Sequence, residues 1–162
     1  MTSYTVIESP IGPLLVARDD GGITALLLPH GRRPARPAAD WLRDDAAFDD
    51  IRTQLAEYFA GERTSFDVPL HMLGSAFQRR VWTQLLRIPC GETTSYGAIA
   101  AAVGGSPRAV GAANGQNPIA IIVPCHRVIG ADGSLTGYGG GLHRKRWLLE
   151  HEGAAFRAPL AA

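Results

Sequence analysis

The stretch Ile119-Ala-Ile-Ile-Val-Pro-Cys-His-Arg-Val-Ile129 decides how the rest of the chain is interpreted. Its five apolar or small residues, 119–123, predict a short buried strand. Pro124 cannot donate to a sheet ladder, so the strand is expected to end there. Cys125 would then lie at the mouth of a buried element, with His126 beside it. A cysteine next to a histidine in a positive setting is the arrangement that yields a thiolate at neutral pH.

Two geometries are open for this Cys-His pair, because neighbouring side chains on a regular strand point to opposite faces. Either both residues lie on a turn, or they interact through a bridging water, which we favour. His126 would also need a carboxylate to fix its tautomer, as in other sets of nucleophile, base and orienting residue. The alternative interpretation is a buried structural cysteine beside a surface histidine, because free cysteine usually packs as a small hydrophobic residue.

The chain has 162 residues, enough for one good core or two small domains. No apolar run approaches 18 residues, so no transmembrane helix is expected. Residues 1–8 lack the basic and apolar regions of a signal peptide. The two cysteines, Cys90 and Cys125, form neither a disulfide framework nor a metal knuckle. A working thiolate fits a reducing compartment, so we expect a cytoplasmic protein.

Charge is unevenly distributed along the chain, although the net charge is only +1. Residues 1–71 contain 7 Arg against 11 Asp or Glu, a net charge of −4. Residues 72–153 contain 8 Arg or Lys against 4 Asp or Glu, a net charge of +4. A basic second half suggests a polyanionic partner for that half. We therefore expect a support domain at 1–71, a functional domain at 72–153 and a loose tail at 154–162.

The first 71 residues predict a small domain in which an antiparallel sheet packs with one helix. Strands are predicted at residues 4–8, 14–18, 23–28 and 66–70. The turn residues Asp19-Asp-Gly-Gly22 are typical of a β-hairpin with a four-residue loop. Apolar residues at helical spacing predict a helix over 44–60, and Gly61 is a good stop for it. This part carries no obvious chemistry.

Short helices dominate the prediction for the second domain. They are predicted at residues 75–88, 94–103, 106–115 and 142–152. The two middle helices enclose Gly104-Gly105 and match the helix-turn-helix pattern. The second of them is mostly alanine and glycine, so it either approaches another backbone closely or packs tightly in a core. Together the halves predict an α+β fold, with an antiparallel-sheet-plus-helix domain before a mostly helical domain with a helix-turn-helix.

Several motifs between residues 76 and 153 resemble the O6-alkylguanine-DNA alkyltransferases, also called methylated-DNA–protein-cysteine methyltransferases. The motifs are Pro124-Cys-His-Arg-Val128, Ser95-Tyr-Gly97, Arg108-Ala-Val-Gly-Ala-Ala-Asn-Gly115, Asn117-Pro118, Gly137-Tyr-Gly-Gly-Gly141 and Trp147-Leu-Leu-Glu-His-Glu-Gly153. Several motifs in order are far more specific than one Cys-His pair. The resemblance therefore replaces the interpretation of Cys125 as a structural residue. The first domain fits the family's variable first domain more loosely.

The resemblance implies direct DNA repair, in which the alkyl group of O6-alkylguanine moves irreversibly to Cys125, once per protein molecule. The helix-turn-helix would enter the minor groove and the target base would be flipped out, because the alkylated oxygen otherwise lies inside the stack. Arg108 resembles the arginine that fills the gap left by the base. Tyr96 resembles the tyrosine that crowds the 3′ phosphate. Further expected DNA contacts are Thr94, Ser95, Ala109, Ala112 and Ala113.

The resemblance also assigns roles around the nucleophile Cys125. His126 would act through a water as its base, and Glu152 would orient His126. Asn117 would hold the turn under the active-site strand. Tyr138 would bond the guanine and help protonate it as it leaves.

Backbone groups are implied to read the flipped base in the same pocket. The N–H of Gly139 would bond O6, while the carbonyls of Cys125 and Val128 would accept from the exocyclic amine. The remaining pocket residues are expected to be Asn114, Gly140 and Lys145. The implied partner is double-stranded DNA containing O6-alkylguanine, bound by a monomer without membrane, metal or small-molecule cofactor. The resemblance allows O4-alkylthymine as a second substrate and cooperative binding along DNA.

This chain departs from the family pattern in three places. The stretch between Tyr96 and Arg108 is about two residues shorter than usual, which changes where the recognition helix starts. Gly139 stands where many members carry serine, so only the backbone donor is present. The first domain has no Cys and His cluster, so the zinc site of some relatives is not expected.

Three other functions share parts of this pattern. A relative that binds damage without repairing it would replace the active cysteine, and Cys125 is present. A transcription factor would place polar side chains on its recognition helix, and this one is mostly alanine and glycine. A Cys-His-Glu hydrolase would need an oxyanion hole and would leave the helix-turn-helix unexplained.

Overall fold

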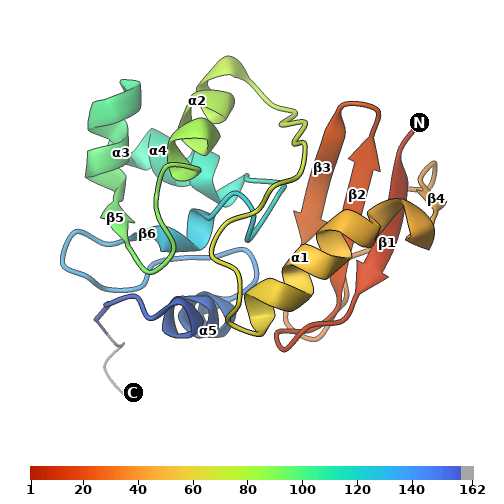
Figure 1. Cartoon of the computed structure of the whole chain (residues 1–162). Coiled ribbons are helices and arrows are strands. Elements are labelled where there is room, and N and C mark those ends of the chain that lie inside the picture. Colours follow the sequence, from red (N-terminus) through yellow and green to blue (C-terminus); the bar gives the residue numbers. More distant parts are fainter. Residues whose placement is uncertain (158–162) are drawn as a thin grey trace. The chain divides into compact units, whose positions relative to one another are not determined.

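The computed structural model describes residues 1–157, which form two compact units (Figure 1). The first unit contains Met1–Leu73 together with Pro118–Ile122. The second contains Gly74–Asn117 and the chain from Val123 onward. The short segment Pro118–Ile122 thus belongs to the first unit, although it follows the predicted boundary by more than forty residues. Within the described residues, no helix is long and apolar enough to cross a membrane.

The first unit is built on a four-stranded sheet in the order β3-β2-β1-β4. Strands β1 (Ser3–Ile7), β2 (Leu14–Asp19) and β3 (Gly22–Leu27) are antiparallel neighbours, and the two-residue β4 (Leu42–Arg43) runs parallel to β1. The predicted hairpin is confirmed, but its loop has two residues because Asp19 and Gly22 pair with each other. A glycine is required at Gly22, where φ is 132° and a Cβ would lie 2.5 Å from the Pro69 carbonyl oxygen.

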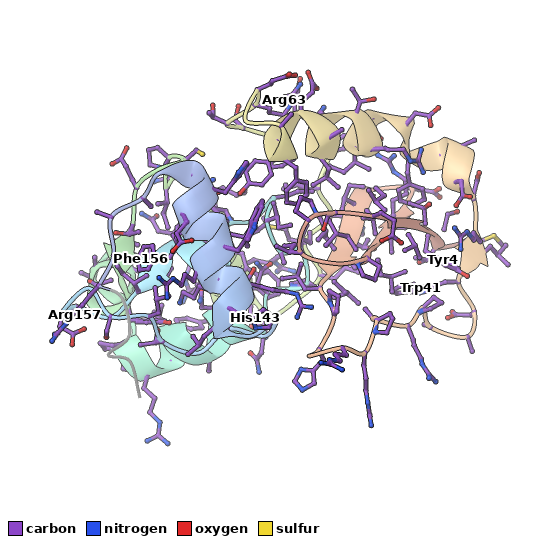
Figure 2. All side chains as sticks on the ribbon, turned by 90° about the horizontal axis from the view of Figure 1, so that it is seen from below. Tyr4, Trp41, Arg63, His143, Phe156 and Arg157 are labelled. Carbon is purple, nitrogen blue, oxygen red and sulfur yellow. The ribbon has the colours of Figure 1, made fainter. Side chains whose placement is uncertain are left out.

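The predicted helix over 44–60 is confirmed as a 3₁₀ turn, η1 (Asp45–Phe48), followed by α1 (Asp49–Phe59). Figure 1 shows α1 lying across one face of the sheet, and its fully buried side chains form the core there. These side chains are Ile51, Leu55 and Tyr58. Beyond its end, Arg63 folds back to pair with Glu57 at 3.2 Å (Figure 2).

The strand predicted over residues 66–70 is wrong. Only Leu70 makes a bridge, with Ile23 of β3. The reason lies in Gln54 on α1, whose side chain accepts from the N–H of Asp67 at 2.8 Å and donates to its carbonyl at 2.9 Å. One helix side chain therefore takes both backbone groups that a strand partner would need.

The strand predicted over residues 119–123 is also wrong. Ile119 makes one parallel bridge to Leu26, after which the chain turns. The N–H of Ile122 donates to the carbonyl of Ala120 at 2.8 Å, and Ile121 between them has φ 71°. This is a γ-turn with positive φ, which costs a β-branched residue of order 1–3 kcal/mol. The side chains are nevertheless buried, so burial was predicted correctly and the backbone path was not.

The second unit contains three packed helices, α2 (Ala76–Leu85), α3 (Tyr96–Val103) and α4 (Pro107–Gly115). Serine side chains cap all three, at Ser75, Ser95 and Ser106. The two helices predicted for the helix-turn-helix are present as α3 and α4, and residues 94–95 precede them as a short strand, β5 (Thr94–Ser95). β5 pairs in parallel with β6 (Val128–Ile129).

Helix α5 (Leu142–Glu152) ends where predicted, because Gly153 adopts the left-handed conformation with φ 73°. The chain beyond it stays packed as far as it is described: Ala154 and Phe156 join a small apolar cluster with Leu149, and Figure 2 shows Phe156 beside α5. Residues 158–162, the rest of the predicted loose tail, lie outside the described residues. The predicted α+β fold class is confirmed.

Candidate active site

Cys125 begins a short 3₁₀ turn, η2 (Cys125–Arg127), immediately after Pro124. The N–H of Cys125 donates to the carbonyl of Val123 at 2.8 Å, and Pro124 between them has φ −83° and ψ 65°. This is an inverse γ-turn, to which the fixed φ of proline is well suited. Cys125 and His126 therefore lie on a turn, which is the geometry that we did not favour from the sequence. The turn leaves the bridging water between the two side chains a proposal.

The Cys125 thiol is held in a largely buried position, with only 6% of the residue exposed. Burial raises the pKa of Cys125, while a hydrogen bond with the Asn117 side chain, the charge of Lys145 and a hydrogen bond with Tyr138 act in the opposite direction. The resting side chain is thus a protonated thiol surrounded by groups that favour its thiolate. A base must remove the proton before the sulfur can act as a nucleophile.

His126 is fully buried and is oriented by Glu152. Its Nε2 lies 2.8 Å from Oε2 of that carboxylate. Burial lowers the pKa of His126, with the Glu152 hydrogen bond and charge opposing the shift, so the imidazole is neutral. Because the carboxylate only accepts, the hydrogen is assigned to Nε2. Nδ1 is then a buried acceptor, and among residues 1–157 it has no hydrogen-bond partner.

Arg127 completes this network, although no role was predicted for it from the sequence. Its Nε donates to Oε1 of Glu152 at 2.8 Å and its Nη2 to Oε2 at 3.0 Å. Its Nη1 donates to the carbonyl of Ile88 at 2.6 Å. The Glu152 side chain is fully buried, so this two-point contact compensates a charge that would otherwise be costly. The sequence signal that could have indicated this role is the position of Arg127 directly after His126 in the Pro124-Cys-His-Arg-Val128 motif.

Two asparagines hold the backbone around the nucleophile. Nδ2 of Asn117 donates to the carbonyl of Val123 at 2.8 Å, across the turn that ends at Cys125. Nδ2 of Asn114, on α4, donates to the carbonyl of Cys125 itself at 3.3 Å. Asn114 is 4% exposed, and within the described residues its Oδ1 has no partner. The second helix of the helix-turn-helix is therefore joined directly to the nucleophile's backbone.

Lys145 is buried although it lies on a helix whose sequence predicts a basic face. Its Nζ donates to the carbonyls of Val128 at 2.7 Å and Thr136 at 3.2 Å. Burial lowers the pKa of Lys145 to about 8, and the nearby Cys125 opposes this shift. The ammonium group therefore combines two roles: it fixes the carbonyl of Val128 and places positive charge near the thiol.

The glycine-rich segment after β6 brings Tyr138 close to the thiol of Cys125. Gly140 is buried, and its carbonyl accepts from Arg144 at 2.9 Å. Gly139 is exposed, and a Cβ added there would meet no atom within 4 Å. A serine at this position would therefore fit without rearrangement.

The predicted DNA contacts fall on two faces of the helix-turn-helix. Arg108, Ala109 and Ala112 are exposed on α4. Ala113 is 2% exposed and its carbonyl accepts from the indole of Trp82 at 2.8 Å, so it is a core residue and not part of the exposed face. At the start of α3, the Tyr96 hydroxyl lies 2.5 Å from Oγ1 of Thr136. Thr94 and Ser95 in β5 are half-buried.

In the part of the chain that the structure describes, no group of three or more His, Cys, Asp or Glu side chains could hold a metal ion. The site brings together a buried thiol, a neutral imidazole, an orienting carboxylate and a nearby ammonium group.

Comparisons with known proteins agree with one another. Residues 2–72 match the family model for the ribonuclease-like domain of 6-O-methylguanine DNA methyltransferase, and residues 76–154 match the model for its DNA-binding domain. A methylated-DNA–protein-cysteine methyltransferase from Mycobacterium bovis is 56% identical over 162 residues, covering 98% of this chain and 96% of that protein.

Solved structures show the same likeness. The crystal structure of Mycobacterium tuberculosis O6-methylguanine methyltransferase aligns with a TM-score of 0.87 at 54% identity, covering 99% of this chain and 97% of that one. The crystal structure of Mycobacterium tuberculosis OGT in complex with DNA aligns with a TM-score of 0.85 at 55% identity, covering 93% of this chain and 92% of that one.

Proposed function

Because the chain belongs to the 6-O-methylguanine DNA methyltransferase family, we propose that it repairs DNA by moving the alkyl group from O6 of alkylated guanine to the sulfur of Cys125. The observation that carries the assignment of the nucleophile is the neutral, buried His126 beside it, whose Nε2 is held by Glu152. Nδ1 is then a buried nitrogen with a free lone pair, and we propose it as the atom that receives the thiol proton.

In the proposed reaction, the proton of the Cys125 thiol passes through a water to Nδ1 of His126. The resulting imidazolium is stabilised by the carboxylate of Glu152, which Arg127 holds at two points. The thiolate attacks the alkyl carbon in line, the carbon–oxygen bond breaks, and its electron pair stays with the guanine. Tyr138 helps to protonate the departing base. A thioether has no activated acyl carbon for water to attack, so each protein molecule reacts once.

The proposed substrate is O6-alkylguanine in double-stranded DNA, delivered to the thiol by base flipping. Helix α4 offers a low surface of exposed alanines to the minor groove, with Arg108 near its start. Tyr96, at the start of α3, would contact the phosphate beside the flipped nucleotide. We propose that the protein acts as a monomer in the cytoplasm, where a reducing environment preserves the thiol.

The test is intact-protein mass spectrometry after mixing with duplex DNA that contains one O6-methylguanine. We expect the mass of one methyl group, mapped to Cys125 and limited to one per protein, and no gain for Cys125→Ser. A stable complex with no mass gain would overturn the proposal and favour a protein that binds damage without repairing it.

A further inference from the structure

We propose that helix α2 carries a second DNA contact, a groove that binds phosphates of the duplex flanking the lesion. This α2–α3 groove lies between α2 and the end of α3, has a volume of about 630 Å³ and is lined by Arg79, Arg80 and Arg87. The inference rests on the proposed function, because it extends the DNA contact beyond the helix-turn-helix.

The first argument is uncompensated charge. Between residues 74 and 118 the sequence contains four arginines, no lysine and a single acidic residue, Glu92. In the described part of the chain, no ion pair involves the three arginines of the groove. Most other arginines do pair with a carboxylate; they are Arg18, Arg43, Arg52, Arg63, Arg127, Arg146 and Arg157. Guanidinium groups that gather in one groove without a carboxylate partner are available to a polyanion.

The second argument is position. The Arg80 guanidinium lies 5.4 Å over the ring of Phe77, and that ring packs against the turn of the helix-turn-helix. A Cβ added to Gly105 in this turn would lie only 3.0 Å from Phe77. The next residues begin α4, which carries Arg108. The groove therefore starts beside the N-terminal end of the helix proposed to enter the minor groove, where a DNA backbone passing α4 can continue onto α2.

The third argument is the kind of group that lines the groove. Thr83 and Gln84 add a hydroxyl and an amide to the guanidinium groups, and these are side chains that commonly bond phosphate oxygens. One of the arginines is partly fixed, since Nη1 of Arg79 donates to the carbonyl of Gly74 at 3.0 Å. Such contacts position a duplex without reading its sequence. Ala76, Ala102 and Val103 complete the lining, so the preference for a phosphodiester backbone rests on the three guanidinium groups and on their place beside the helix-turn-helix.

The test compares Arg79→Ala, Arg80→Ala, Arg87→Ala and their triple combination with the parent and with Arg146→Ala. Arg146 is an exposed arginine of the same unit outside the groove and changes the net charge by the same amount as each single variant. Exposed helix positions tolerate alanine well. Binding of a fluorescent lesion-free duplex is measured by anisotropy from 50 to 200 mM salt.

Each lost phosphate contact lowers the slope of log K against log salt by about 0.9. The slope of the triple variant is therefore expected to be less steep than that of the parent by about 2.7. As a result, the ratio of the parent's binding constant to that of the triple variant should fall about 40-fold between 50 and 200 mM salt. We also expect a fall in the ratio of two rates of alkyl transfer to Cys125, the rate with the alkylated duplex divided by the rate with free O6-benzylguanine. The second rate does not depend on DNA binding. Replacement of the three arginines by lysine should restore most of the slope.

A salt slope in the triple variant equal to that of the parent would overturn the inference. A change in slope per removed arginine no larger than the change caused by Arg146→Ala would also overturn it. Loss of the slope in the lysine variant as well would overturn it too, because the effect would then come from altered packing and not from charge. Failure of the proposed function is a separate outcome, because the parent would then gain no alkyl group from either substrate.

Discussion

Replacing Arg127 with methionine is expected to destabilise the second unit strongly, because it leaves the buried carboxylate of Glu152 without its main partner. The guanidinium makes two bonds to that carboxylate, at 2.8 and 3.0 Å, and a third to the carbonyl of Ile88. The two side chains are 7% and 0% exposed. Removing one partner of such a buried pair costs about 3–5 kcal/mol of unfolding free energy.

The chain contains a matched control for this prediction. Arg146 pairs with Glu150 on the surface of α5, and the Nε to Oε1 distance is again 2.8 Å, but both side chains are about half exposed. An exposed pair of this spacing contributes only about 0.3–0.5 kcal/mol. Arg127→Met and Arg146→Met therefore break contacts of equal length, and we expect their effects to differ about tenfold because only the first pair is buried.

Urea unfolding followed by circular dichroism measures both effects. With a slope of about 2 kcal/mol per molar urea, a loss of about 4 kcal/mol lowers the midpoint by about 2 M. The double variant Arg127→Met, Glu152→Gln should recover much of this loss, since it leaves no buried carboxylate charge and keeps an acceptor for Nε2 of His126. Equal small shifts for Arg127→Met and Arg146→Met, or no recovery in the double variant, would refute the reasoning.

Three further predictions concern single side chains. Burial lowers the pKa of Lys145 to about 8, so above that pH the folded state binds fewer protons than the unfolded state. The unfolding free energy of the parent relative to Lys145→Met should therefore rise from about pH 8 to pH 10.5, and urea midpoints measure this rise. Gly139→Ser should change the melting temperature little, whereas Gly22→Ala should lower it clearly, because a Cβ there meets the Pro69 carbonyl. Arg108→Ala should weaken duplex binding in anisotropy titrations while alkyl transfer from free O6-benzylguanine is partly preserved; equal repair of duplex DNA by variant and parent would contradict the intercalation role.

Local sequence signals predicted the helices well, because the contacts that begin and end a helix involve residues close together in the sequence. Ser75, Ser95 and Ser106 each accept a hydrogen bond from a backbone N–H of the helix they cap. Gly153 supplies the left-handed residue that ends α5. Such contacts span three or four residues, so a single sequence contains all the information needed to recognise them.

The two strand predictions that were wrong, at residues 66–70 and 119–123, fall where local sequence signals do not determine the backbone path. Residues 119–123 are as buried as a strand would be, but a γ-turn at Ile121 redirects them, and no local propensity favours positive φ for isoleucine. Asp67 is held by Gln54 from α1 and not by a strand. In the same way, the role of Arg127 depends on Glu152, which is 25 residues away. Motif resemblance named the nucleophile and its base, while this clamp became visible only in three dimensions.

The alanine- and glycine-rich α4 left two interpretations open, close approach to another backbone or tight packing in a core, and the structure gives each to a different face. Ala109 and Ala112 are exposed, whereas Ala113 and Asn114 are buried. At 1.5 Å per residue, Arg108 and Asn114 are about 9 Å apart along the axis. One short helix thus carries the residue proposed to displace the base at one end and a direct bond to the Cys125 carbonyl at the other. Bulk added to the exposed face would hinder the proposed approach to DNA, whereas bulk added to the buried face would displace the helix that holds the Cys125 carbonyl.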